Sequence, residues 1–160
     1  MSSATVITGD LFESDAKYIV HQCNCVTWNA AHLAQSMFRR FPHADIYNPR
    51  RGTEKHDEPG TIIVRGDGES ERFVVAILGQ YYPGSPKYPN SSKDGYNVRQ
   101  KYFRQGLSKL AEVTDLHSVA FPWGIGCGAA GGDWPTYLQM IQEFAASVPE
   151  VRVTIVQLPS

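Results

Sequence analysis

The sequence is poor in cysteine, and its three cysteines, Cys23, Cys25 and Cys127, are not spaced as in disulfide-bonded proteins. Their number is odd, and two of them are only two residues apart, which argues against a disulfide framework. Thiols that stay reduced are typical of proteins that work inside the cell. We therefore expect free cysteines and a cytoplasmic or nuclear location.

Long apolar segments and an excess of either charge are also missing. No apolar run approaches the roughly 20 residues that a membrane helix needs, so no association with a membrane is expected. The first residues, Met1 to Thr5, lack the basic start and the apolar stretch of a signal peptide. The net charge of −1 argues against a general electrostatic surface for nucleic acid, although it leaves room for a local basic patch.

The length of 160 residues is enough to bury a sizeable core as one domain. Hydrophobic residues make up 42% and charged residues 19% of the chain, which is typical of a soluble globular protein. No internal repeat and no low-complexity linker divides the sequence. We therefore expect a single domain over residues 1–160, present as a monomer and without a cofactor.

Apolar runs alternate with segments of helical periodicity. Strands are predicted at residues 5–8, 17–23, 61–65, 72–78, 117–121 and 151–156, and helices at 30–40, 94–113 and 133–147. Asn29 and Asp133 are the predicted N-caps of the first and last helix. The alternation indicates an α/β domain with one mixed sheet between layers of helices, and residues 61–65 and 72–78 form a candidate antiparallel hairpin.

A glycine-rich segment connects the predicted strand at 117–121 to the last helix. Its five glycines are Gly124, Gly126, Gly128, Gly131 and Gly132. Glycine adopts positive φ and lets the backbone approach a ligand closely. A turn from a strand into a helix also presents backbone N–H groups to anions. The alternative is a connection without a ligand, for which five glycines would be entropically wasteful.

Three loops are expected beyond the carboxyl ends of the strands, where α/β sheets bind ligands: residues 9–11, 24–32 and 124–133. Asp10 either accepts a hydrogen bond from an exocyclic amine such as that of adenine or caps the short turn after it. Asn24 either binds ribose hydroxyl groups or supports the loop backbone. The residues by themselves leave both choices open.

A metal site and a cysteine nucleophile are two further candidates. His21, Cys23 and Cys25 share one face of a predicted strand, and with His32 they resemble a set of zinc ligands. No second pair completes a standard spacing, so cysteines packed in a core strand are the simpler interpretation and no metal is expected. Cys127 lies near a helix N-terminus, where thiols become reactive, but no base accompanies it.

Three motifs, taken in chain order, resemble the macrodomain family. They are Gly9-Asp-Leu-Phe12, His21-Gln-Cys-Asn-Cys25 and the segment Gly124 to Trp134. The resemblance covers nearly the whole chain. It is nearest to the branch with terminal-ADP-ribose protein glycohydrolases, DNA ADP-ribosyl glycohydrolase antitoxins and ADP-ribose-1″-phosphate phosphatases. It implies a three-layer α/β/α sandwich with a mixed, mostly parallel sheet and a cleft for ADP-ribose.

The resemblance also implies roles for single residues. Asp10 would hold the adenine amine beside the Leu11 backbone, and Asn24 would bind the distal ribose. Residues along the diphosphate and distal ribose would be Ala30, Ala31 and His32, and those wrapping the diphosphate from the other side would be Gly124, Ile125, Gly126, Cys127, Gly128 and Ala129.

Three candidates for catalysis follow from the same resemblance. Asp133 and His21 would lie near the distal ribose, where either is a candidate general base. His32 would stabilise anionic charge when protonated. Simpler structural roles remain open, since Asp133 is also a candidate helix N-cap and His21 a candidate core histidine.

Two positions depart from the family pattern. The first ligand loop is usually rich in glycine, whereas this chain has Trp28-Asn-Ala-Ala-His32. The glycohydrolase branch uses a lysine after the fourth strand, where this chain has Gln80. Catalysis through a covalent lysine intermediate is therefore not expected.

Three functions remain open. One is a hydrolase that removes ADP-ribose from a modified protein or nucleic acid, or phosphate from ADP-ribose-1″-phosphate. Another is a reader that binds ADP-ribose without turnover. A third, compatible with both, is contact with nucleic acid through Arg39, Arg40, Arg50 and Arg51.

Overall fold

The centre of the molecule is a six-stranded sheet in the order β1-β6-β5-β2-β4-β3, seen in a computed structural model that describes residues 2–160. The strands are β1 (Thr5–Thr8), β2 (Tyr18–Cys23), β3 (Ile62–Arg65), β4 (Phe73–Leu78), β5 (Ser118–Pro122) and β6 (Arg152–Gln157). Every neighbouring pair is parallel except β3 and β4, which run antiparallel. The predictions of a mostly parallel sheet and of the hairpin are confirmed.

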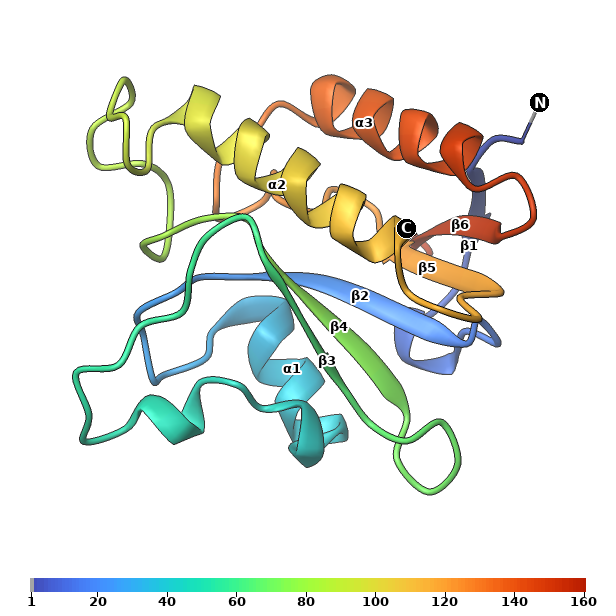
Figure 1. Ribbon diagram of the computed structural model, residues 1–160, viewed down its shortest axis with the longest axis horizontal. Helices are drawn as coiled ribbons and strands as arrows, with labels where there is room; N and C mark the ends of the chain where they lie inside the picture. Colours follow the sequence, from blue (N-terminus) through green and yellow to red (C-terminus); the bar gives the residue numbers. More distant parts are fainter. Residues whose placement is uncertain (1) are drawn as a thin grey trace.

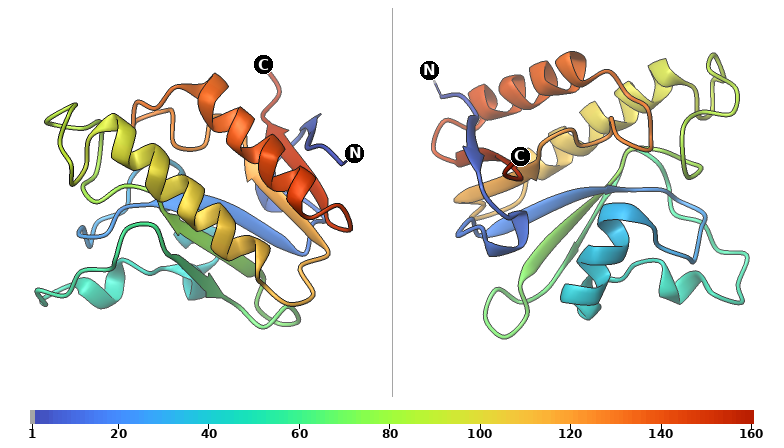
Figure 2. Two further views of the ribbon diagram at one scale, coloured as in Figure 1. Left: turned by 45° about the horizontal axis from the view of Figure 1, so that its top comes forward. Right: turned by 180° about the vertical axis from the view of Figure 1, so that it is seen from behind.

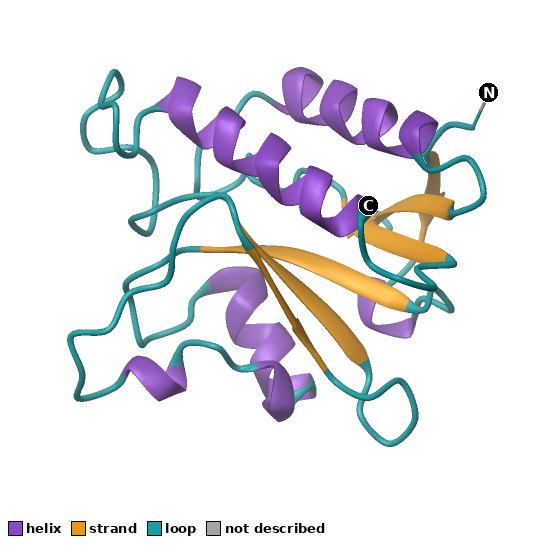
Figure 3. Ribbon diagram, viewed as in Figure 1, coloured by secondary structure: helices purple, strands orange, loops and turns teal. Residues whose placement is uncertain are grey.

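Helices cover both faces of this sheet (Figures 1 and 2). The α-helices are α1 (His32–Arg40), α2 (Tyr96–Ala111) and α3 (Trp134–Ser147), and three short 3₁₀ helices are η1 (Leu11–Glu13), η2 (Pro42–Ala44) and η3 (Asn48–Arg50). Helices α2 and α3 lie on one face and α1 on the other (Figure 3). The predicted three-layer α/β/α sandwich is confirmed. Within residues 2–160, no helix is long and apolar enough to cross a membrane.

Two hydrophobic cores form, one on each face of the sheet. Strand β4 contributes to both, because alternate side chains of a strand point to opposite faces. Val75 and Ile77 pack in the core beneath α2 and α3, whereas Val74 and Leu78 pack in the core beside α1. This double burial explains why β4 is apolar almost without interruption, as expected of a central strand in a mostly parallel sheet.

Two local predictions were wrong. Helix α1 begins at His32 rather than at residue 30, and its N-cap is Ala31 instead of Asn29, with no side-chain capping bond. The loop that precedes it stays extended for two residues longer. In α2, helical periodicity predicts a buried stripe of Val98, Tyr102, Leu107, Leu110 and Ala111. Leu107 and Leu110 are buried, but Val98 and Tyr102 are only partly buried, and Arg99 is buried as well. Its burial depends on an ion pair with the preceding loop, which helical periodicity does not reveal.

The parallel strands bring four loops to one edge of the sheet. These loops follow β1, β2, β4 and β5, so segments far apart in sequence meet beyond the carboxyl ends of the strands. In α/β proteins this edge is where ligands bind. The candidate site is therefore built mainly from loops, while the sheet fixes where each loop starts.

Candidate functional site

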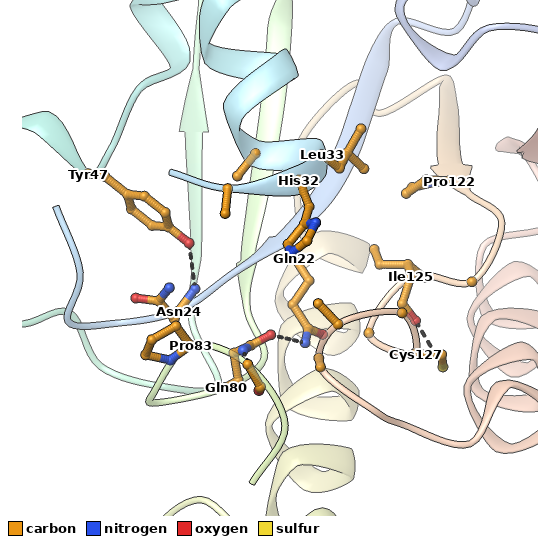
Figure 4. Close-up of a pocket in the computed structure, with 18 of the residues that line it drawn as sticks. Gln22, Asn24, His32, Leu33, Tyr47, Gln80, Pro83, Pro122, Ile125 and Cys127 are labelled. Atoms are coloured by element: carbon orange, nitrogen blue, oxygen red, sulfur yellow. Dashed lines mark hydrogen bonds between the residues drawn. The ribbon is translucent and has the colours of Figure 1, made fainter. Parts of the chain in front are cut away.

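A cavity of about 320 Å³ opens at this edge of the sheet (Figure 4). One wall is the glycine-rich loop, for which we use this name for residues 124–132. The opposite wall is formed by the start of α1, and Gln22, Tyr47 and Gln80 lie between the two walls. Apart from Tyr47, which directly precedes η3, the lining residues come from the ends of β2 and β5, the loops after β2, β4 and β5, and the start of α1.

The backbone of the glycine-rich loop forms a tight turn, and several of its N–H groups are not used within it. Gly124 and Gly126 have φ of 78° and 77°, and Cys127 N–H closes a turn onto the carbonyl of Gly124 at 2.8 Å. Among residues 2–160, the N–H groups of Gly126, Gly128, Ala129 and Ala130 have no hydrogen-bond partner. Successive free N–H groups in a turn attract anions, so this wall suits a phosphate or diphosphate.

The glycines of this loop serve two different needs. A Cβ on Gly126 would lie 2.6 Å from the Tyr137 ring, and one on Gly132 would lie 2.5 Å from the carbonyl oxygen of Gly126. The fold itself therefore requires glycine at these two positions. Gly128 has no positive φ, and a Cβ there would meet no heavy atom within 4 Å. Its lack of a side chain leaves open space in the cavity instead.

The opposite wall ends in the uncapped first turn of α1. The N-cap Ala31 makes no side-chain hydrogen bond, and the first backbone bond of the helix runs from Gln35 N–H to the Ala31 carbonyl. The positive end of the helix dipole and its free N–H groups therefore lie at the cavity. His32 has φ of 53°, a left-handed conformation uncommon for a residue other than glycine. Its side chain projects into the cavity (Figure 4).

Asn24 offers one amide group to the cavity. Its Oδ1 accepts hydrogen bonds from the N–H groups of Val26 and Thr27, at 3.0 and 2.9 Å, and from the Thr27 hydroxyl at 3.1 Å. These bonds use the acceptor to hold the loop, and the amide nitrogen Nδ2 remains as a donor. The two roles considered for Asn24, loop support and ligand binding, are thus compatible.

Buried Arg50 holds the same loop from behind. Its guanidinium donates to the carbonyl oxygens of Asn24 and Thr27, both at 2.9 Å, and pairs with Asp57 at 2.6 Å. The Tyr47 hydroxyl accepts the Asn24 N–H at 2.9 Å. Only 4% of the Arg50 side chain is exposed, so its proposed place in a basic surface patch is wrong. Its charge is used to fix the wall of the cavity.

Gln80, where the resemblance to macrodomains would place a lysine, is fixed by hydrogen bonds in the floor of the cavity. Its Nε2 donates to the carbonyl oxygens of Tyr82 and Gly84, at 2.9 and 3.4 Å, and its Oε1 accepts from Gln22 Nε2 at 2.7 Å. The two carbonyl acceptors fix the orientation of the Gln80 amide, because they require the NH₂ side. Gln80 therefore supplies no nucleophile and ties the loop after β4 to β2 (Figure 4).

The structure brings most of the predicted ligand-binding residues to the cavity. Residues that line it are Asn24, Ala31, His32, Gly124, Ile125, Gly126, Cys127, Gly128 and Ala129, whereas Asp10, Leu11, Ala30, His21 and Asp133 do not. Asp10 accepts a hydrogen bond from Phe12 N–H at 2.9 Å and caps η1, while Leu11 is buried. The ligand contacts assigned to these residues by resemblance remain predictions.

Two candidate catalytic residues occupy structural positions. His21 is 1% exposed and packs edge-to-face against Phe38, and burial lowers its pKa to about 4, so it is neutral at neutral pH. Asp133 caps α3 by accepting hydrogen bonds from the N–H and hydroxyl of Thr136. Neither side chain lines the cavity, and their catalytic roles remain predictions.

The cysteines are protonated thiols. Burial raises the pKa of Cys127 to about 12, and its Sγ lies 3.3 Å from the Ile125 carbonyl oxygen. A thiol in this state is a poor nucleophile near neutral pH. Burial also raises the pKa of Cys23 to about 12, beside the His21 ring at 3.5 Å. Within residues 2–160, no three His, Cys, Asp or Glu side chains gather where they would hold a metal ion.

Several residues that shape the site gave no signal in the sequence. Arg50 lies in the polar stretch 48–60, whose sequence indicates a solvated loop, and Tyr47 directly precedes that stretch. Arg99 lies within an amphipathic helix, where an arginine is ordinarily exposed. Gln22 alternates with apolar neighbours in β2 and reaches the cavity only because the strand ends there. Each depends on partners distant in sequence.

Solved structures similar to this chain include several macrodomains. The macrodomain of Mycobacterium tuberculosis DarG matches with a TM-score of 0.75 and 23% identity over 100% of both chains. The macrodomain of Thermus aquaticus DarG matches with a TM-score of 0.68 and 22% identity over 98% of both chains. An Oceanobacillus iheyensis macrodomain with ADP matches with a TM-score of 0.60 and 18% identity, over 97% of this chain and 82% of that one.

The scan against models of protein families finds no match, and the search among curated proteins finds none either. Identities below 25% establish a shared fold. The structural matches nevertheless span the whole chain, and they therefore include the cavity edge together with the sheet and its helices.

Proposed function

Since the chain has the macrodomain fold, we propose that it binds ADP-ribosyl groups in the cavity between the glycine-rich loop and α1. The observation that carries this proposal is the pair of facing walls, each with backbone N–H groups that have no partner within residues 2–160. An anion between them would receive donors from both sides. A structure of an Oceanobacillus iheyensis macrodomain variant with ADP-ribose offers a fold-level parallel.

The ligand's parts suit different sides of the cavity. Its diphosphate would lie against Gly126, Gly128 and Ala129, where free N–H groups cluster. Its distal ribose would lie near the Nδ2 donor of Asn24 and the His32 side chain. Adenine would extend past Pro122 toward Asp10, whose carboxylate is exposed after β1.

Calorimetry with ADP-ribose, ADP and adenosine tests this proposal. We expect ADP-ribose and ADP to bind and adenosine to bind much more weakly, because the cavity's donors face the diphosphate. If adenosine binds as tightly as ADP, the free N–H groups contribute nothing to affinity and the assignment of an anion site is wrong. Absence of ADP-ribose binding would refute the proposed function.

Hydrolysis is the second candidate function, and the observation in its favour is that the His32 side chain projects into the cavity. Of the titratable groups in the cavity, Cys127 and Tyr47 have raised pKa values because they are buried. The two ring nitrogens of an imidazole let it accept one proton and donate another, and the His32 ring projects into the cavity, so we assign His32 as the proton carrier. It would accept a proton from the attacking water and return one to the leaving group as the bond at the distal ribose breaks.

A substrate panel separates the hydrolase from a reader. ADP-ribosylated protein, ADP-ribosylated DNA and ADP-ribose-1″-phosphate are each incubated with the wild-type protein and with His32→Gln. A hydrolase releases product from at least one substrate, and His32→Gln slows the release by about 100-fold or more while ADP-ribose still binds. A reader binds ADP-ribose and releases nothing.

Asp133→Asn tests the competing assignment of Asp133 as the base. Asparagine keeps the N-cap acceptor for α3 but cannot accept a proton. Turnover that collapses in Asp133→Asn and persists in His32→Gln would move the catalytic role from His32 to Asp133. Equal turnover of Asp133→Asn and wild type would leave Asp133 with its structural role alone.

A further inference from the structure

Two carbonyl groups of the glycine-rich loop are held by side chains from other segments. The Ser85 hydroxyl donates to the carbonyl oxygen of Ala129 at 3.0 Å. The Arg99 guanidinium donates to the carbonyl oxygen of Ala130 at 3.3 Å. Carbonyl oxygens carry partial negative charge, so an anion-binding loop functions only when they are turned away from the anion.

Peptide geometry links these bonds to the loop's donors. In a trans peptide the C=O of one residue and the N–H of the next point in opposite directions, and no described peptide bond is cis. The bond from Ser85 to the Ala129 carbonyl therefore turns the Ala130 N–H the other way. That N–H has no partner within residues 2–160, and Ala130 lines the cavity.

Arg99 connects the two loops that carry this arrangement. It is 2% exposed, and its Nη1 donates to the Gly84 carbonyl at 2.6 Å as well as to Ala130. Its Nη2 pairs with Asp94 at 2.6 Å and donates to the Tyr82 carbonyl at 3.2 Å. The planar guanidinium thus fixes the loop after β4 against the loop after β5, and Asp94 compensates its buried charge.

We propose that Ser85 and Arg99 are positioning residues for the loop's peptide groups: Ser85 directs the Ala130 N–H towards the diphosphate, and Arg99 keeps the Ala130 carbonyl oxygen turned away from it. The N–H on the far side of that second peptide, of Gly131, donates to the Gly128 carbonyl at 3.0 Å and stays within the loop. Neither side chain lines the cavity, so both act through the backbone of Ala129 and Ala130. The inference rests on the proposed function, because it presumes a ligand with a diphosphate.

Substitutions at Ser85 test the inference without endangering the fold, because Ser85 is exposed and makes one side-chain hydrogen bond. By calorimetry, we expect Ser85→Ala to weaken ADP-ribose binding about 3- to 10-fold, the effect of one misdirected donor. Ser85→Thr keeps the hydroxyl and should bind within about twofold of wild type. Ser92→Ala, an exposed serine between β4 and α2, is the matched control and should change nothing.

Arg99→Lys is the stronger variant. A lysine ammonium keeps the charge opposite Asp94 but lacks the planar fork that reaches several carbonyl groups at once. We expect ADP-ribose affinity to fall more than about tenfold. Failure of this variant to fold would leave the Ser85 series as the deciding measurement.

The amide resonance of Ala130 provides a readout that a purely structural role would not change. Titration with ADP-ribose and, separately, with inorganic pyrophosphate should shift the Ala130 proton downfield in wild type and Ser85→Thr, and much less in Ser85→Ala. Ser85→Ala with wild-type affinity and a wild-type Ala130 shift would overturn the inference. Wild-type protein that binds pyrophosphate but ignores ADP-ribose would refute the proposed function and leave this inference standing.

Discussion

Replacing Gly128 by valine should weaken ligand binding without destabilising the fold. Gly128 lines the cavity, has no positive φ, and leaves no heavy atom within 4 Å of an added Cβ. A valine side chain would therefore meet no protein atom at its Cβ. It would instead occupy space beside the free N–H groups to which we assign the diphosphate.

The magnitudes for Gly128→Val follow from these contacts. A residue with a side chain restricts the unfolded chain more than glycine does, so the free energy of unfolding should change by less than about 1 kcal/mol. Loss of one charge-assisted hydrogen bond to the diphosphate corresponds to about 1.5–3 kcal/mol. The dissociation constant for ADP-ribose should therefore rise by roughly 10- to 150-fold.

Gly126→Ala in the same loop is the comparison variant. Its Cβ would lie 2.6 Å from the Tyr137 ring on a backbone with φ of 77°, so strain should lower the free energy of unfolding by about 2 kcal/mol or more. Urea denaturation and calorimetry on both variants give the two quantities. Gly128→Val that binds ADP-ribose as tightly as wild type would show that the diphosphate does not lie at this loop.

Three further predictions concern side chains to which we assign no hydrogen bond with the ligand. Arg50→Met removes the ion pair with partly exposed Asp57 and two carbonyl contacts, and should lower the free energy of unfolding by about 2 kcal/mol or more. The control Arg39→Met, at an exposed arginine, should change it by less than about 0.5 kcal/mol. His21 has a folded-state pKa of about 4 against an ordinary 6.5, so the unfolded chain takes up its proton first as the pH falls. The contribution of neutral His21 to the free energy of unfolding should be fully present above pH 6.5 and be lost towards pH 4, by up to about 1.4 kcal/mol per pH unit. In urea denaturation, His21→Phe should flatten this pH dependence, and equal slopes in the two proteins would refute the assignment. Cys127→Ala should leave ADP-ribose affinity within about twofold of wild type, and Cys127 should react slowly with iodoacetamide at pH 7.5, because burial raises the pKa of its thiol to about 12.

The order of elements and the glycine-rich loop could be predicted from the sequence because their signals are local. Apolar runs of β-branched residues mark strands, and each predicted strand matches one in the sheet within one residue at either end. Asp133 before Pro135 marks the start of α3, since a capping side chain reaches only its own first turn. The start of α1 was misplaced because the N-cap falls on Ala31, two residues beyond Asn29, whose carbonyl accepts the Thr27 hydroxyl in the preceding loop.

The candidate site was predictable only in part. The positions of Asn24, His32 and the glycine-rich loop at one edge follow from the strand order, because parallel strands place their carboxyl ends together. Gln80 was recognised as a departure from the family pattern, but its hydrogen bonds to Gln22 and to two carbonyl groups were not predictable. These bonds show that Gln80 has a structural role at this edge of the sheet.

The sequence by itself thus determined the fold class, the order of elements and the loop suited to an anion, since these depend on periodicity and on glycine's conformational freedom. Only the tertiary structure decided which charges are buried and which peptide groups face the cavity. Arg99 meets Ala130, 31 residues further along the chain, and Arg50 meets Asn24, 26 residues back. A buried charge is stable only beside such partners, and they become neighbours only when the chain has folded.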